Sequence, residues 1–245
     1  MTNIKYSFLV TSIAGISTII GILPIFFNIK NKDKIINFSL SFSAGVMIST
    51  SLFSLLPESI NLLSSKYNSI ATIFTILIFS LIGISISILI DRLFSTIPDK
   101  LYSLGIINML VLMIHNIPEG ILTFATTSNN KRLGFIIALT IICHNIPEGI
   151  SIAIPIYYST KSKIKAFFYT FISGFSEILG AVITYLFLYK YINTYFISYL
   201  LALIIGLMIY IPIYKLLPSA LNYHKKKITI LSFLIGIIFI LIFNI

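Results

Sequence analysis

The chain has 245 residues, of which 58% are hydrophobic and only 10% are charged, and its formal net charge is +10. A soluble domain of this length carries far more surface charge, so the composition excludes a soluble globular protein and indicates an integral membrane protein. The basic residues lie in short loops and form no patch with aromatic side chains, which argues against nucleic-acid binding. The single cysteine, Cys143, excludes an internal disulfide and a cysteine-based zinc site.

Eight apolar segments follow one another along the chain, each close to the roughly 20 residues that a helix needs to cross a bilayer. They cover residues 6–29, 36–57, 69–90, 104–128, 133–157, 166–189, 194–217 and 228–244. Helices satisfy their backbone hydrogen bonds internally in lipid, so we expect an all-α bundle of eight transmembrane helices that forms one domain over residues 1–245. We expect the first segment to be a span, because it is long enough to cross and lacks a clear cleavage site for a signal peptidase.

The basic residues of the predicted loops alternate in number along the chain. The loops after the first, third, fifth and seventh segments contain Lys30, Lys32, Lys34, Arg92, Lys100, Lys161, Lys163, Lys165, Lys225, Lys226 and Lys227. The other three loops contain only Lys66, Lys131, Arg132 and Lys190. The positive-inside rule therefore predicts that the first set of loops faces the cytoplasm and that both termini lie outside it.

The hexapeptide His-Asn-Ile-Pro-Glu-Gly occurs twice, at His115–Gly120 and at His144–Gly149. The two copies lie in the fourth and fifth predicted spans, which run in opposite directions. A weaker match at a constant offset relates the second span to the seventh. It pairs Gly45, residues 47–48 and residues 55–57 with Gly206, residues 208–209 and residues 216–218. Two nested inverted pairs indicate a two-fold axis in the membrane plane, which is typical of secondary transporters with a substrate site near the midplane.

Ionisable side chains gather near the middle of the predicted spans. Three of the seven acidic residues, Glu119, Glu148 and Glu177, lie there, and so do two of the three histidines, His115 and His144. A charged residue at a helix centre costs roughly 2.5–3.5 kcal/mol on insertion scales. These groups therefore require mutual compensation, which a bound divalent cation supplies. Without a metal, protonation of the glutamates would supply it.

Helix spacing divides each copy of the hexapeptide into two sides. His115 and Asn116 lie four and three residues before Glu119, so both share a helical face with it. The second copy repeats this pattern with His144, Asn145 and Glu148. We therefore predict two adjacent metal positions, one rich in histidine and one rich in amides, which share the two motif glutamates. The third glutamate, Glu177, can join the amide-rich position.

The predicted donors are nitrogen and oxygen atoms without a thiolate. This set suits Zn(II), Fe(II), Mn(II), Co(II) or Cd(II), and it does not suit Cu(I) or an all-oxygen Ca(II) site. The Met47 thioether could also reach the metal, with core packing as the alternative role; the same two readings apply to Met208. Glu177 has the alternative role of a structural acid paired with Ser173 or Ser176.

The other charged residues have simpler roles in the prediction. We expect Asp91 and Arg92 to form an ion pair at the end of the third span. Asp99 and His224 are expected in loops.

These motifs resemble the ZIP (Zrt-, Irt-like) metal transporter family and, within it, the bacterial ZupT-type zinc transporters. The resemblance rests on the two hexapeptides, on SGFSEILGAVITYL at 173–186 and on SAGVMISTSLFSLLPES at 43–59. It implies eight spans with both ends outside, a binuclear metal centre and uptake of divalent metal into the cytoplasm, often by a homodimer. The loop at roughly 91–103 is short and lacks histidine, unlike the long His-rich loop of many members, so metal sensing by this loop is not expected.

The resemblance also implies a ligand set. The first metal position takes His115, Glu119, His144 and Glu148, with Met47 as a further candidate. The second takes Asn116, Glu119, Asn145, Glu148 and Glu177.

The predicted function is import of divalent metal cations, with zinc as the cargo that the resemblance favours and iron, manganese, cobalt and cadmium as metals that the donors also accept. The expected partners are the metal ions and the lipid bilayer. An intramembrane metalloenzyme is one alternative, but the chain has no His-Glu-x-x-His helix and the cluster is nearly symmetric, whereas a catalytic zinc needs an open position and a distinct acid or base. A transporter that couples protons to an organic substrate is the other, with the Glu and His side chains as the proton relay.

Overall fold

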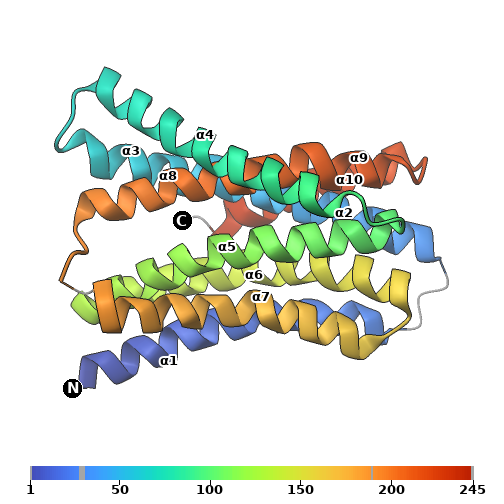
Figure 1. Cartoon of the computed structure of the whole chain (residues 1–245), viewed down its shortest axis with the longest axis horizontal. Coiled ribbons are helices and arrows are strands. Elements are labelled where there is room, and N and C mark those ends of the chain that lie inside the picture. Colours follow the sequence, from blue (N-terminus) through green and yellow to red (C-terminus); the bar gives the residue numbers. More distant parts are fainter. Residues whose placement is uncertain (1, 28–30, 189, 244–245) are drawn as a thin grey trace.

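The computed structural model describes residues 2–27, 31–188 and 190–243, and the regular structure within these ranges is entirely helical. The helices lie side by side along the long axis of the molecule (Figure 1). In chain order they are α1 (Thr2–Ser17), η1 (Thr18–Phe26), α2 (Lys32–Thr50), η2 (Ser51–Leu55), α3 (Leu56–Ser64), α4 (Ser69–Phe94), α5 (Lys100–Asn129), α6 (Lys131–Thr160), α7 (Lys163–Ile183), η3 (Thr184–Leu188), α8 (Thr194–Ile211), η4 (Pro212–Leu216), α9 (Leu217–Leu221) and α10 (Lys226–Phe243). Element η1 is a 3₁₀-helix, and η2, η3 and η4 are π-helical.

The prediction of an all-α membrane bundle is confirmed. Seven helical segments in the described ranges are long and apolar enough to cross a bilayer: Asn3–Phe26, Lys32–Ser64, Ser69–Phe94, Lys100–Asn129, Lys131–Thr160, Lys163–Leu188 and Tyr195–Leu221. Helix α10, of 18 residues, corresponds to the eighth predicted span and packs along α2. The predicted span ends at 28–29, 189 and 244, and the predicted loop residue Lys30, lie outside the described residues.

The connections between helices alternate between the two ends of the bundle, as Figure 1 shows. The start of α1 and the connections α3–α4, α5–α6 and α7–α8 lie at one end. The connections α4–α5, α6–α7 and α9–α10 lie at the other, which is the end that carries Lys100, Lys163 and Lys225. The described loops that were predicted to face the cytoplasm therefore lie at the same end of the molecule.

Short polar side chains begin most of the long helices. The residues Asn31, Asn68, Asp99, Asn130, Ser162 and Asn193 each accept a hydrogen bond from a backbone N–H in the first turn of the helix that follows. Such N-caps satisfy donors that have no partner within the helix. The pKa of the Asp99 carboxyl is lowered because the Ser159 hydroxyl and the backbone N–H of Tyr102 donate to its charged form.

Glycines bring paired helices into close backbone contact and show how the two halves correspond. A side chain at Gly45 on α2 would collide with the Phe233 carbonyl on α10, and one at Gly206 on α8 would collide with the Ser80 carbonyl on α4. Because Gly45 and Gly206 are matched in the predicted repeat, the pair α2 and α10 is equivalent to the pair α8 and α4. The π segments agree, since η2 and η4 each begin six residues after these glycines.

The second matched pair of glycines follows the same rule. A side chain at Gly120 on α5 would collide with the Glu177 carbonyl on α7, and one at Gly149 on α6 would collide with the Thr18 carbonyl on η1. The pair α5 and α7 is therefore equivalent to the pair α6 and α1–η1. The predicted pairings of spans 4 with 5 and 2 with 7 thus extend to spans 1 with 6 and 3 with 8.

One predicted ion pair is wrong. Asp91 forms an ion pair with Lys215 of η4, and its other carboxylate oxygen accepts a hydrogen bond of 2.7 Å from the Tyr210 hydroxyl. Arg92 was the predicted partner. Adjacent residues on a helix point about 100° apart and do not face each other, so a partner on a neighbouring helix is reached more easily.

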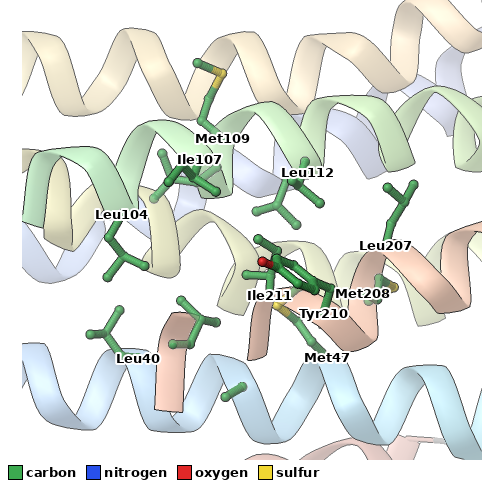
Figure 2. Close-up of a cluster of buried hydrophobic side chains, with 14 of the residues drawn as sticks. Leu40, Met47, Leu104, Ile107, Met109, Leu112, Leu207, Met208, Tyr210 and Ile211 are labelled. Carbon is green, nitrogen blue, oxygen red and sulfur yellow. The ribbon is translucent and has the colours of Figure 1, made fainter. Parts of the chain in front are cut away.

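The largest cluster of buried apolar side chains lies between α2, α5, α6 and α8 and is called the apolar cluster below. Leu40, Leu104, Ile107 and Ile211 belong to it (Figure 2). Met47 and Met208 lie in it as well, both fully buried. Met47 therefore has the packing role that was its alternative, and a metal contact by its sulfur stays a prediction.

Candidate metal centre

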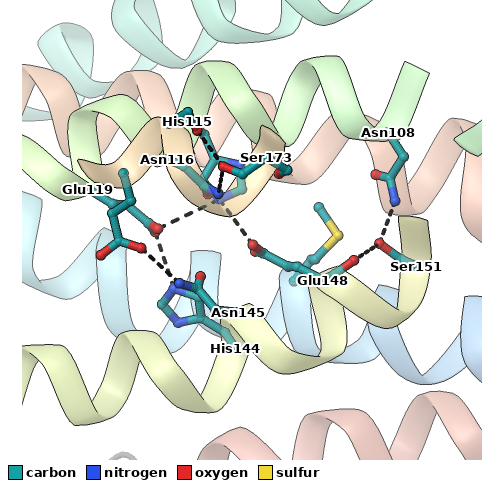
Figure 3. A network of polar contacts seen from close by, with 12 residues as sticks. Asn108, His115, Asn116, Glu119, His144, Asn145, Glu148, Ser151 and Ser173 are labelled. Carbon is teal, nitrogen blue, oxygen red and sulfur yellow. Dashed lines mark hydrogen bonds and ion pairs between the residues drawn. The ribbon is translucent and has the colours of Figure 1, made fainter. Parts of the chain in front are cut away.

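The predicted metal ligands of the two hexapeptides come together inside the bundle (Figure 3), and Glu177 joins them through a hydrogen bond from Asn145. All of them are buried, with exposed fractions between 0% and 2%: His115, Asn116 and Glu119 on α5, His144, Asn145 and Glu148 on α6, and Glu177 on α7. Burial of this many polar side chains is costly unless each finds a compensating partner. Their contacts therefore decide what the cluster can bind.

The histidines and glutamates of the two hexapeptides contact each other across the helix pair. His115 Nε2 lies 3.4 Å from Glu148 Oε2 of the other copy and 3.8 Å from Glu119 Oε2 of its own. His144 Nε2 lies 3.2 Å from Glu119 Oε1, again across the pair. Each histidine thus reaches the glutamate of the opposite copy, and the two motifs form one cluster.

In this conformation the described part of the chain contains no closed group of three or more His, Cys, Asp or Glu side chains arranged around one metal ion. The nitrogen and carboxylate atoms instead face each other in pairs. None of the ring nitrogens of His115 and His144, nor the carboxylate oxygens of Glu119 and Glu148, has a hydrogen-bond partner. Buried polar atoms in folded proteins are nearly always satisfied, and these atoms have only ion-pair contacts with one another, so the cluster is suited to a cation.

The two asparagines are held by their amide nitrogens. Asn116 Nδ2 donates to the Ser173 carbonyl at 2.9 Å, and Asn145 Nδ2 donates to the Ala14 carbonyl at 3.0 Å. Asn145 Nδ2 also donates to Glu177 Oε2 at 2.9 Å. Both side-chain oxygens are buried without a partner, so each asparagine keeps one free oxygen donor.

Glu177 joins the cluster through Asn145 and not through a serine. The serine alternative fits less well, because the Ser176 hydroxyl donates to the Ser173 carbonyl. Gly120 explains the placement of this glutamate, since the close approach of α7 to α5 at that glycine brings the Glu177 backbone next to the hexapeptide. The Oε1 atom of Glu177 is buried without a partner.

Thr18 is a position that the sequence reasoning missed. Gly15 and Gly174 pack against each other, while Gly21 packs on α6 as Gly180 packs on α5. Gly15 and Gly21 are six residues apart, and so are Gly174 and Gly180. Thr18, three residues after Gly15, is therefore equivalent to Glu177, three residues after Gly174. The Thr18 hydroxyl is buried without a partner. The equal glycine spacing was the signal in the sequence that could have identified it.

A cavity of about 720 Å³ leads to the cluster from the end of the bundle where α5 joins α6. Glu119 and His144 line its inner part, and the exposed residues Glu58, Asn61 and Leu133 line its outer part. From Leu133 to His144 the helix α6 rises about 16 Å at 1.5 Å per residue. This cavity therefore connects the cluster with one end of the bundle.

Comparison with known proteins agrees with this architecture. A family model described as ZIP zinc transporter matches residues 98–244. Zinc transporter ZupT of Chlorobium limicola is 37% identical, with 96% of each chain covered. Zinc transporters ZupT of Clostridium perfringens and Streptococcus mutans are 33% and 32% identical, over 97% and 95% of this chain and 94% of each relative. These similarities exclude the metalloenzyme alternative, because the matched proteins are transporters. The chain belongs to the ZIP family of zinc transporters.

Proposed function

We propose that the protein imports divalent metal cations, zinc first among them, into the cytoplasm through the buried cluster on α5, α6 and α7. The observation that carries this proposal is the meeting of both hexapeptides in one cluster of histidine and carboxylate donors without hydrogen-bond partners. The names of the relatives favour zinc as the cargo. The same donors accept Fe(II), Mn(II), Co(II) and Cd(II).

The cluster holds two adjacent metal positions in this proposal. The first uses His115, His144 and the two motif glutamates. Neighbouring donors around a tetrahedral zinc with bonds of about 2.1 Å are about 3.4 Å apart. The nitrogen–oxygen separations of 3.2, 3.4 and 3.8 Å lie around this value, so the side chains need small movements to bind a cation. Met47 remains a candidate for a further donor at this position.

The second position uses the free oxygens of Asn116 and Asn145 together with Glu177. Its donors are all oxygen atoms, so it binds a borderline-soft cation less tightly than the histidine position does. Glu119 and Glu148 belong to both positions. A cation can therefore pass from one to the other without losing all of its protein ligands.

The orientation of the chain follows from its basic loops. We infer that the end of the bundle with Lys100, Lys163 and Lys225 faces the cytoplasm and that both termini lie outside. The cavity then opens outside, and the apolar cluster closes the cytoplasmic half. A cation enters through the cavity, exchanges its water for the cluster ligands, and leaves when the cytoplasmic half opens.

Residues 1–245 form one transport domain in this proposal. On the family resemblance, we also propose that two copies of the chain form a homodimer. Chemical cross-linking of the protein in membranes tests the dimer.

Uptake of radioactive zinc into proteoliposomes tests the function. The wild type should accumulate zinc, and His115→Ala and Glu148→Ala should each lower the initial rate at least tenfold. His224→Asn is the matched control, because His224 is exposed and has a positive φ that asparagine tolerates. Normal uptake in both cluster variants would contradict the site. A folded wild type that transports no divalent metal would contradict the function.

A further inference from the structure

The inverted repeat relates the end of the bundle that contains the cavity, called the open half below, to the opposite end, called the closed half. Each residue of the cavity therefore has an equivalent on the other side of the cluster. The two hexapeptides are 29 residues apart, and Gly45 and Gly206 are 161 residues apart. The offset of 29 relates the cavity residues Leu133, Ile136 and Thr140 on α6 to Leu104, Ile107 and Val111 on α5. The offset of 161 relates the cavity residues Leu201 and Thr50 to Leu40 and Ile211. These five equivalent residues belong to the image of the cavity in the closed half.

These five residues of the image are apolar and buried. All five residues of that set belong to the apolar cluster, and their exposed fractions range from 0% to 4%. Leu40, Leu104, Ile107 and Ile211 lie together in Figure 2. A cation that leaves the metal centre toward this end meets a region with few polar groups.

Asn108 on α5 and Ser151 on α6 are polar residues that lie in the image together with these apolar side chains. The equivalent residues in the cavity are the apolar Ile137 and Leu122. The polar character of Asn108 and Ser151 is therefore not required by the repeat. Asn108 Nδ2 donates to the Ser151 hydroxyl, which in turn donates to the Glu148 carbonyl at 2.5 Å. Figure 3 shows this pair beside Glu148.

The oxygen of the Asn108 amide is buried without a partner, and the whole side chain has an exposed fraction of 0%. An amide oxygen in apolar surroundings is unfavourable unless it gains a partner at some stage. Asn108 lies seven residues before His115, about 10 Å along α5, and Ser151 lies three residues after Glu148 on α6. The pair is therefore the next polar step beyond the metal centre.

We propose that Asn108 and Ser151 form an oxygen site that binds the divalent cation after it leaves Glu148 on its way out of the metal centre. This inference rests on the proposed transport function. Neutral oxygen donors hold a borderline-soft cation weakly, and a conduction pathway needs weak sites so that the ion can leave. The Asn108 side-chain oxygen and the Ser151 hydroxyl oxygen are the donors.

Initial rates of radioactive zinc uptake and equilibrium zinc binding, both per mole of folded protein, test this site. Asn108→Leu should lower the maximal uptake rate at least tenfold, while zinc affinity of the detergent-solubilised protein stays within twofold of the wild type. Asn108→Asp keeps an oxygen donor and should restore at least part of the rate. Ser151→Ala should lower the rate about threefold and tests the site independently of the folding of Asn108→Leu.

Asn37→Leu is the matched control, because Asn37 is an equally buried amide that donates to the Ala220 carbonyl and the Thr229 hydroxyl, away from the metal centre. Its rate per folded protein should equal that of the wild type. Wild-type rates in both Asn108→Leu and Ser151→Ala would overturn the site, and so would equal losses in Asn108→Leu and Asn37→Leu. An inactive wild type would overturn the proposed function and this inference with it.

Discussion

Glu177 on α7 and Thr18 on η1 occupy equivalent places in the two halves of the molecule. Their backbone carbonyls lie against the equivalent glycines Gly120 and Gly149, and both side chains are buried. Glu177 supplies a carboxylate to the cluster, whereas Thr18 supplies a neutral hydroxyl. The two-fold relationship of the backbone is therefore broken in the chemistry of the site, because only one half supplies a carboxylate at this place to the proposed amide-rich metal position.

Replacing Glu177 by threonine makes the two halves alike and removes the charge that the second metal position needs. We expect Glu177→Thr to bind one zinc ion per chain where the wild type binds two. Equilibrium dialysis with metal analysis by mass spectrometry measures this number. Thr18→Val is the control and should keep two ions, and two ions in Glu177→Thr would show that Glu177 is not a ligand.

Glu58 places an exposed carboxylate in the outer part of the cavity. A negative charge at the mouth raises the local concentration of cations. We expect Glu58→Gln to raise the KM for zinc about threefold at low ionic strength and to leave the maximal rate unchanged. Because salt screens this attraction, the difference should shrink at high ionic strength. Glu58→Asp keeps the charge and is the control; a KM for Glu58→Gln equal to that of the wild type would contradict this role.

The ion pair between Asp91 and Lys215 is largely shielded, with side-chain exposed fractions of 15% and 24%. Removing one partner leaves an uncompensated charge, so Lys215→Met should destabilise the protein by about 2 kcal/mol. The double variant Asp91→Asn with Lys215→Met should recover much of this loss. Thermal unfolding in detergent measures the order of stability, with Arg92→Met as the control that changes little. A double variant less stable than Lys215→Met would refute the pairing.

Asp99 caps α5 and gives the stability of the protein a dependence on acid pH. Hydrogen bonds from the Ser159 hydroxyl and the backbone lower its pKa in the folded state. A group with a lowered folded pKa stabilises the protein above its unfolded pKa of about 3.9, and this contribution is lost as the pH falls through the lower folded value. Asp99→Asn keeps a capping side chain, so its unfolding temperature should fall less than that of the wild type between pH 5 and pH 3. Parallel curves would contradict this role.

The meeting of the polar residues in one buried cluster was predictable, because these residues carry a large free-energy cost in lipid. Polar side chains at spacings of three and four within apolar spans have few arrangements that compensate them, and an identical second copy reduces the choice further. The structure places His115 beside Glu148 and His144 beside Glu119, as this reasoning requires. The spans were predictable for a related reason, since backbone groups in lipid must be paired within helices.

Other features depend on packing between distant segments and were missed. Asp91 pairs with Lys215, which lies 124 residues further along the chain, and helix spacing within one span contains no signal for such a contact. The equivalence of Thr18 with Glu177 becomes visible only when the glycine contacts are known. The cavity depends on which half of a nearly symmetric molecule is open, and the sequence pattern is nearly the same for both halves.

The proposed metal centre holds two metal ions that share Glu119 and Glu148. Anomalous X-ray diffraction from crystals of the zinc-loaded protein, recorded on both sides of the zinc absorption edge, tests it most directly. We expect two peaks, each within bonding distance of both glutamates, with His115 and His144 beside one and Asn116 and Asn145 beside the other. Zinc peaks that lie away from both glutamates, or a single peak that touches neither asparagine, would contradict the claim.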